Sequence, residues 1–248
     1  MNSTPWLIYP KPNPQTKLRL FCCHPAGSGA SIFRSWVNYL HPEIELCALQ
    51  LPGRETRIRE PLYTQLSPLI DTLNEVLSPH LETCPFAFFG HSLGALICFA
   101  LARKLRYQQL PEPIHLFISG RRPPHIPIEE PIHQEVGQIL IDKLREFGGT
   151  SEAVLQNTEL MSLFVPIFRA DLTINETYFY TIEPPLNSPI TAFGGIEDSS
   201  VNQEELSLWN QHTSNSFQLE MFPGNHMFFL EQTQPLIDKI SHDLCDYL

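Results

Sequence analysis

The chain has 248 residues, of which 42% are hydrophobic and 17% charged, and this composition excludes a disordered chain. Its 16 Lys and Arg stand against 27 Asp and Glu, and the net charge of -11 argues against a nucleic-acid partner, which usually needs a basic face. The first residues lack the pattern of a signal peptide, and no apolar run approaches the roughly 20 residues that cross a bilayer, so we expect no membrane partner.

Short apolar strands alternate with helical patterns along most of the chain. The pattern predicts strands over 17–23, 44–51, 85–89, 114–119, 189–193 and 217–222, and helices over 31–40, 66–81, 95–104, 203–211 and 234–248. This alternation is typical of the α/β class, with a mostly parallel central sheet flanked by helices on both faces. We expect one domain over residues 1–248.

Residues 121–180 interrupt this alternation. They carry helical patterns over 136–147, 152–156 and 159–179, and Gly148-Gly149-Thr150 is typical of a hinge. Open α/β sheets bind ligands at the carboxyl ends of their strands, so we expect a helical insertion there that acts as a lid. An ordinary structural subdomain is the alternative.

The six cysteines form no C-x-x-C pair and mostly lie inside apolar runs. They are typical of small core residues in a reducing compartment, and not of a disulfide framework or a zinc site. The cytoplasm is therefore the expected location.

Residues 90–94 read Gly-His-Ser-Leu-Gly, the G-x-S-x-G pattern of a nucleophile elbow. An apolar strand precedes them and an apolar helix follows, as an elbow requires. Gly90 and Gly94 stand where side chains would clash, and the turn presents Ser92 at a helix N-terminus. Ser92 is the candidate nucleophile.

A serine hydroxyl needs a base to remove its proton and an acid to orient that base. In this fold class the order along the chain is Ser, then Asp or Glu, then His. Of the 10 histidines, His226 alone directly follows a late strand, and Gly224 and Asn225 give its loop freedom to turn. His226 is the candidate base.

The candidate acid follows the penultimate strand, where Glu197 and Asp198 are adjacent. The strand that ends at Ser119 is followed by arginines with no acid before Glu129, so the other position for the acid is empty. We choose Asp198, with Glu197 as the alternative.

An oxyanion hole needs two backbone N–H groups that point at the reacting carbonyl oxygen. Leu93 supplies one because it follows the nucleophile. The loop over 23–30 supplies the other, and there Ala26 is favoured over Gly27, while Pro25 has no N–H.

Taken together, these residues resemble a known family, the stand-alone type II thioesterases of polyketide and non-ribosomal peptide assembly lines, in the α/β-hydrolase superfamily. The resemblance runs from about Leu18 to the C-terminal helix. It is carried by the loop after Cys22, Leu51-Pro52-Gly53-Arg54, the elbow, Ser119-Gly120-Arg121-Arg122, Arg169-Ala170-Asp171, Gly194-Gly195 with Asp198, and Gly224-Asn225-His226-Met227-Phe228.

The resemblance implies hydrolysis of acyl or aminoacyl thioesters from the phosphopantetheine arm of carrier proteins, which clears misprimed or stalled chains. One departure is that the family usually reads Phe-Pro-His-Ala-Gly-Gly where this chain reads Cys23-His24-Pro25-Ala26-Gly27-Ser28; the donor at Ala26 survives the change.

The chemistry agrees with this interpretation. Thioesters are good acyl donors, so a triad and an oxyanion hole suffice, and we expect no metal and no organic cofactor beyond the phosphopantetheine of a partner. The alternatives are a carboxylesterase or lipase, an acyltransferase that uses the same serine, and a non-catalytic binding module. We expect a monomer that meets acyl or peptidyl carrier proteins transiently.

Because carrier proteins are generally acidic and this chain is acidic too, docking is expected to rely on local basic patches. Three clusters are candidates: Arg54, Arg57 and Arg59; Arg103, Lys104 and Arg106; and Arg121 with Arg122. The first and third follow strand ends on the edge of Ser92, and the third is the predicted docking site.

Overall fold

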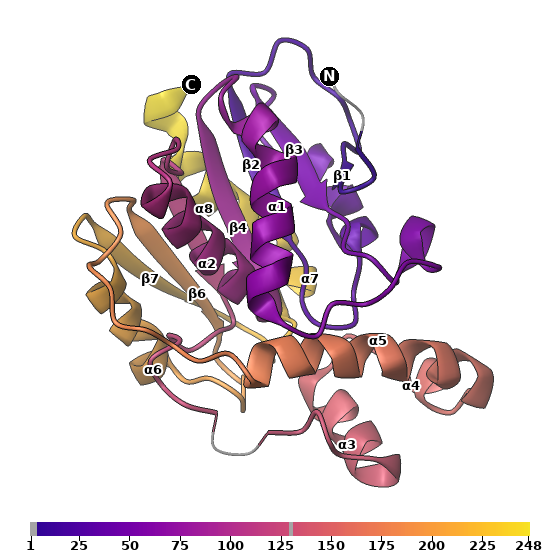
Figure 1. The fold of residues 1–248 in the computed structure, drawn as a ribbon. Helices are drawn as coiled ribbons and strands as arrows, with labels where there is room; N and C mark the ends of the chain where they lie inside the picture. The colour runs from indigo at the N-terminus through magenta and orange to yellow at the C-terminus, as the bar shows by residue number, and fades with distance from the viewer. Residues whose placement is uncertain (1–3, 129–130) are drawn as a thin grey trace.

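The computed structural model describes residues 4–128 and 131–248. Within them, one sheet holds seven strands in the order β1-β3-β2-β4-β5-β6-β7, with β1 antiparallel to β3 and every other neighbouring pair parallel (Figure 1). The strands are β1 (Leu7–Ile8), β2 (Leu18–Cys23), β3 (Ile44–Leu49), β4 (Phe86–His91), β5 (His115–Ser119), β6 (Ile190–Gly195) and β7 (Phe217–Phe222). The predicted α/β class with a mostly parallel sheet is confirmed.

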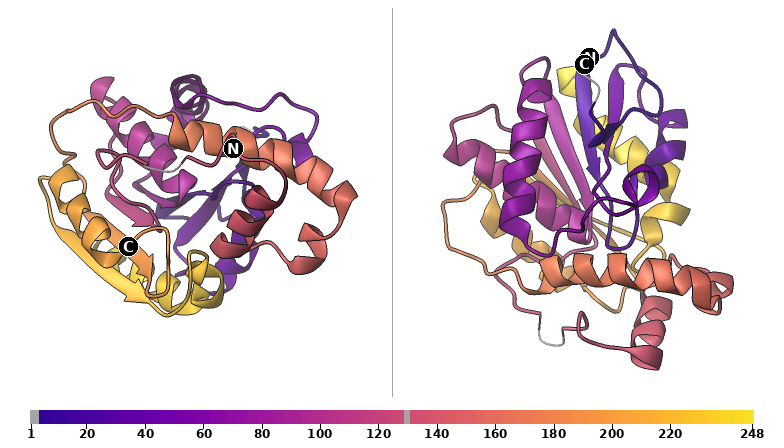
Figure 2. Two further views of the ribbon diagram at one scale, coloured as in Figure 1. Left: turned by 90° about the horizontal axis from the view of Figure 1, so that it is seen from below. Right: turned by 45° about the vertical axis from the view of Figure 1, so that its right-hand side comes forward.

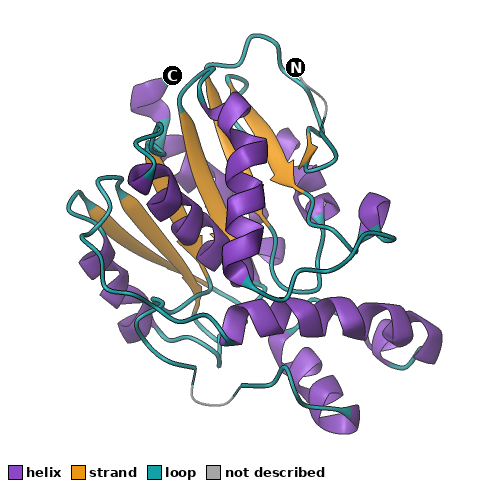
Figure 3. Cartoon of the chain, in the orientation of Figure 1, coloured by secondary structure: helices purple, strands orange, loops and turns teal. Residues whose placement is uncertain are grey.

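Helices cover both faces of the sheet. On one face lie α1 (Leu66–Leu81) and α2 (Leu93–Tyr107), and on the other lie the 3-10 helix η1 (Ala30–Asn38) and α8 (Thr233–Asp243) (Figure 3). Side chains of successive strand residues point to opposite faces of the sheet: Phe88 packs in the layer of α1 and α2, and Phe89 packs in the layer of η1 and α8. Burial on both faces is why these strands are continuous apolar runs in the sequence.

Two segments that were predicted as helices contain 3-10 helix in the structure. The segment predicted over 31–40 is the 3-10 helix η1, and the segment over 203–211 divides into α6 (Gln203–Ser207) and the 3-10 helix η3 (Leu208–His212). The C-terminal helix likewise begins as α7 (Phe228–Glu231), continues as α8 and ends as η4 (Cys245–Tyr247), near 234–248 as predicted. None of the helices that the structure describes is both long and apolar enough to cross a membrane.

The helical insertion between β5 and β6 holds three helices, close to their predicted positions: α3 (Gly137–Phe147), α4 (Glu152–Leu155) and α5 (Thr158–Glu176). Residues 129 and 130, within the predicted span 121–180, lie outside the described residues. The three helices lie across the carboxyl ends of the strands, as the view from below shows (Figure 2). They share an apolar cluster of their own, separate from the two layers on the sheet.

Gly148 and Gly149, between α3 and α4, have φ of 77° and 79°. These left-handed values suit glycine and explain why the predicted hinge carries two of them.

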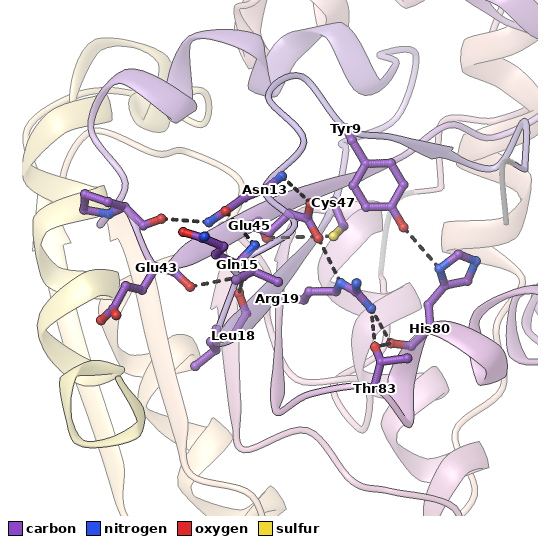
Figure 4. A network of polar contacts seen from close by, with 12 residues as sticks. Tyr9, Asn13, Gln15, Leu18, Arg19, Glu43, Glu45, Cys47, His80 and Thr83 are labelled. Atoms are coloured by element: carbon purple, nitrogen blue, oxygen red, sulfur yellow. Dashed lines mark hydrogen bonds and ion pairs between the residues drawn. The ribbon is translucent and has the colours of Figure 1, made fainter. Parts of the chain in front are cut away.

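A buried polar network lies at the amino ends of the strands, away from the helical insertion (Figure 4). Arg19 near the start of β2 donates to Glu45 near the start of β3 at 2.9 Å, and also to the carbonyl oxygen of His80 at 2.9 Å. Both side chains of the Arg19–Glu45 pair are almost fully buried. This network ties α1 to the amino ends of the strands, while the carboxyl ends are left to the candidate site.

Candidate active site

Ser92 occupies the turn between β4 and α2. Its φ of 54° and ψ of -114° lie outside the regions that L-residues favour, and its amide donates to the carbonyl oxygen of Ser119 on β5 at 2.8 Å. A side chain at Gly90 would collide with the backbone of Gly94, and one at Gly94 with the backbone of Cys23. The local sequence therefore folds into the strand–turn–helix geometry of a nucleophile elbow.

The loops after β6 and β7 bring Asp198 and His226 together. His226 Nδ1 lies 2.8 Å from Asp198 Oδ2, and the Asp198 side chain is fully buried. Burial opposes ionisation, but the hydrogen bonds from His226 and Ser200 outweigh it and hold the pKa of Asp198 below its usual value. The carboxylate therefore stays charged beside the imidazole.

Glu197, the alternative acid, points elsewhere. Its carboxylate accepts a hydrogen bond from the backbone amide of Gly224, and its own amide donates to the carbonyl oxygen of Gly224 at 3.0 Å. Glu197 therefore stabilises the loop that carries His226, and among the described residues the ion pair of the imidazole is with Asp198.

The backbone amides of Ala26 and Leu93, the two candidate oxyanion donors, differ from the amide of Gly27 in what they can bind. The Gly27 amide donates to Asp171 Oδ2 at 2.8 Å, whereas the Ala26 amide has no acceptor among the described residues. Leu93 is the first residue of α2, so its amide has no acceptor within the helix. Ala26 and Leu93 are thus available to a ligand, and Gly27 is occupied.

Asp171 belongs to a buried ion pair that the sequence analysis did not predict. Arg54 donates to both Asp171 oxygens, at 2.5 and 2.8 Å, and to the carbonyl oxygen of Ser28 at 3.2 Å. Both charged side chains are nearly inaccessible, at 5% and 1% exposure. One pair therefore links α5 of the insertion, the loop after β3 and the loop that carries Ala26.

Ser92 and His226 line the same cavity, whose volume is about 710 Å³. The insertion supplies much of its wall, including Phe147, Phe164 and Phe168. The ring centroids of Phe147 and His226 are 5.5 Å apart, so the end of α3 lies against the candidate base. In the part of the chain that the structure describes, no hydrogen bond joins Ser92 to His226; such contacts often tighten only when substrate binds.

His91, next to the nucleophile, is fully buried under the site. Its Nδ1 lies 2.8 Å from Ser119 Oγ, and its ring centroid lies 5.0 Å from that of His226. Burial, and then the neighbouring His226, lower the pKa of His91 well below its usual value. His91 is therefore neutral and adds no second charge beside His226.

In the third predicted docking cluster, Arg121 is buried and cannot serve as a surface docking residue, whereas the Arg122 side chain is 28% exposed and lies 3.3 Å from Glu205. Arg121 is 8% exposed and donates to Asn175 on α5, while Trp209 Nε1 donates to the Arg121 carbonyl oxygen at 2.7 Å. Burial lowers the pKa of Arg121 to about 10. Arg54 and Arg57 are 4% exposed each. These buried guanidinium groups hold the loops around the cavity and cannot form a surface patch.

Comparison with known proteins places this geometry in a family. The model of the thioesterase domain matches residues 18–244. The chain belongs to the thioesterase family. The gramicidin S biosynthesis protein GrsT of Aneurinibacillus migulanus is 42% identical over 240 residues, which cover 96% of this chain and 93% of GrsT.

Solved thioesterase structures agree in fold. RedJ of the prodiginine pathway in Streptomyces coelicolor superposes with a TM-score of 0.87 at 35% identity, covering 92% of this chain and 86% of RedJ. The type II thioesterase BorB from the borrelidin biosynthetic cluster gives a TM-score of 0.89 at 31% identity, over 98% and 99% of the two chains. The resemblance to type II thioesterases is confirmed, and the fold is that of an α/β-hydrolase.

This thioesterase is an enzyme that acts on thioesters. The family match favours this activity over the carboxylesterase, acyltransferase and binding-module alternatives.

Proposed function

We propose that this thioesterase hydrolyses acyl or aminoacyl thioesters carried on the phosphopantetheine arm of carrier proteins, with Ser92, His226 and Asp198 as its catalytic residues. The observation that carries the proposal is the placement of a strained elbow serine and a buried Asp–His pair, 2.8 Å apart, at one cavity. Similarity to GrsT, named for gramicidin S biosynthesis, and to BorB, from the borrelidin biosynthetic cluster, supports assembly-line carrier proteins as the partners.

In the first half of the reaction, Ser92 Oγ attacks the thioester carbonyl while His226 Nε2 accepts the hydroxyl proton. The C–S bond then breaks, and His226 returns the proton to the departing thiolate. The acyl group remains as an ester on Ser92. In the second half, His226 removes a proton from water as the water oxygen attacks this ester. The bond between Ser92 Oγ and the acyl carbon then breaks, His226 returns the proton to Ser92 Oγ, and the free acid leaves.

The amides of Ala26 and Leu93 serve as the oxyanion donors in this proposal. Their availability, and the engagement of Gly27 with Asp171, support that pair. A hydrogen bond of this kind is typically worth about 3–4 kcal/mol to the transition state. The acyl group arrives on the partner's own phosphopantetheine, and we propose that no metal or other cofactor takes part.

The helical insertion is proposed to act as a lid within one domain. Its contacts with His226, Gly27 and the cavity support this role, and the family match runs through it without a break. The free thiols at all six cysteines support a cytoplasmic location. We also propose a monomer that meets its carrier proteins transiently.

The test uses three acyl donors: an acyl-holo-carrier protein, the matching acyl-CoA and the acyl-N-acetylcysteamine. The proposal expects the highest kcat/KM with the carrier protein, labelling of Ser92 by a serine-directed phosphonate, and no turnover by a folded Ser92→Ala variant. Asp198→Asn is expected to lower kcat by about 10⁴-fold, because the imidazole loses its orienting charge. Near-normal Asp198→Asn activity with an inactive Glu197→Gln variant would overturn the choice of acid.

A further inference from the structure

The loop between Asp198 and α6 places one more hydroxyl at the candidate catalytic centre. Ser200 Oγ lies 2.6 Å from Asp198 Oδ1 and 2.9 Å from His226 Nδ1. The Ser200 backbone amide donates to the same Asp198 Oδ1 at 2.8 Å. Ser200 therefore touches both members of the Asp–His pair.

The direction of these hydrogen bonds follows from what each group can do. An ionised carboxylate only accepts, so the Ser200 hydroxyl donates to Asp198 Oδ1. Its lone pairs are then free to face the proton on His226 Nδ1, which is also aimed at Asp198 Oδ2 at 2.8 Å. The Nδ1 proton is thus shared between the carboxylate and the hydroxyl oxygen.

Both oxygens of the Asp198 carboxylate are held by hydrogen bonds from Ser200 and His226. Ser200 engages Oδ1 through its amide and its hydroxyl, so the carboxylate cannot rotate without breaking two hydrogen bonds, and Oδ2 stays pointed at His226. The loop itself is held by Arg122, whose Nη2 donates to the Ser200 carbonyl oxygen at 2.5 Å and whose Nη1 lies 3.3 Å from Glu205 on α6.

We propose that Ser200 is a positioning residue for the reaction, which locks the Asp198 carboxylate and shares the Nδ1 proton of His226. This proposal rests on the proposed catalytic roles of Asp198 and His226. When His226 takes the proton from Ser92, its ring becomes positively charged, and the Ser200 oxygen then adds a second acceptor dipole beside the carboxylate. Ser200 acts through Asp198 and His226 and makes no contact with the reacting carbonyl in this scheme.

The sharpest test is a double-mutant cycle between Ser200→Ala and Asp198→Asn on the full-length enzyme. Ser200→Ala keeps the backbone amide and removes the hydroxyl, so kcat is expected to fall by about tenfold, comparable to the loss of a modest charge-assisted hydrogen bond, with KM unchanged within about twofold. In the Asp198→Asn background the same substitution should lower kcat by clearly less than in the native background, because the carboxylate that Ser200 locks is already lost and only its contact with His226 remains.

Two companion variants separate positioning from folding. Ser200→Thr retains a hydroxyl and is expected to restore most of kcat. Ser207→Ala is the matched control, since the Ser207 hydroxyl donates only to the Glu204 carbonyl oxygen, at 2.6 Å, and lies outside the site; its kcat should equal that of the native enzyme.

The outcomes distinguish this proposal from the function on which it rests. If Asp198→Asn is inactive but Ser200→Ala keeps full kcat, the triad stands and the role of Ser200 is refuted. A tenfold loss that persists undiminished in the Asp198→Asn background, or a rise in KM instead of a fall in kcat, also refutes it, because either means a structural effect. Full activity of both single variants would refute the triad itself.

Discussion

Replacing Asp171 by alanine should destabilise the protein far more than the loss of an exposed ion pair. The substitution leaves the Arg54 guanidinium at about 5% exposure without its carboxylate, and it also removes the acceptor of the Gly27 amide. Breaking one partner of a buried pair typically costs about 3–5 kcal/mol. For a domain of this size that corresponds to a fall in the melting temperature of roughly 6–20 °C.

Urea unfolding of matched variants measures this effect. Asp71→Ala is the control, because Asp71 pairs with Lys104 at 2.6 Å while both side chains are substantially exposed, and such pairs contribute about 0–1 kcal/mol. The double variant Arg54→Met with Asp171→Leu removes both buried charges and should recover part of the free energy of unfolding lost in Asp171→Ala.

In this double variant, kcat should not recover even though part of the free energy of unfolding does. In the double variant the Gly27 amide still lacks its acceptor, so the loop that carries Ala26 is less constrained and kcat stays low. If Asp171→Ala lowers the free energy of unfolding no more than Asp71→Ala does, the buried pair does not hold these loops as the structure indicates. A double variant with native kcat would separately refute the link to the Ala26 loop.

Two further predictions concern the insertion and pH. Hydrogen exchange should be faster in α3 than in β4 and in residues 168–175; equally slow exchange in all three would remove the support for gating. Burial lowers the pKa of His115 to about 4 in the folded protein, below its unfolded value of about 6.5. The unfolded chain therefore binds more protons between these values, and stability present above pH 6.5 is lost as the pH falls toward 4. Urea unfolding of His115→Gln should show a pH slope flatter by up to about 1.4 kcal/mol per unit, and an unchanged slope would contradict this reasoning.

The strands could be predicted because parallel strands buried on both faces leave uninterrupted apolar runs, as Phe86–His91 does. β1 could not, since two residues in a proline-rich segment carry no periodicity. The 3-10 form of η1 was hidden for a different reason. Its buried residues Ala30, Phe33 and Trp36 are three apart, a spacing that suits three residues per turn as well as it suits an α-helix.

The candidate site was predictable where roles follow from position after a strand. Ser92 directly follows β4, Asp198 and His226 lie in the loops just after β6 and β7, and the structure brings the last two into contact. The arginines were misread because their partners are distant in the sequence: Asp171 lies 117 residues after Arg54. Ser200 was missed because a serine in a polar loop has no distinguishing pattern; only its two contacts identify it.

If the insertion acts as the proposed lid, its contacts predict which part of it opens. The C-terminal half of α5 is tied to the body of the enzyme by Asp171, which binds Arg54 and Gly27, and by Asn175, which accepts from Arg121. Opening the whole insertion would expose these charges in unpaired form, which is costly. The charged pairs of Arg145 on α3 stay within the insertion. The end of α3 touches the body through Phe147 against His226 and through an exposed hydrogen bond from Ser199 Oγ to Glu146 at 2.9 Å. Because the glycine pair follows Phe147 directly, we expect rotation at Gly148 and Gly149 to move the end of α3 away from the cavity while the C-terminal half of α5 stays in place. This motion has to break part of the apolar cluster that the two helices share. Access would then be controlled beside His226, the proposed base, and the loop carrying Ala26 would keep its shape throughout the cycle.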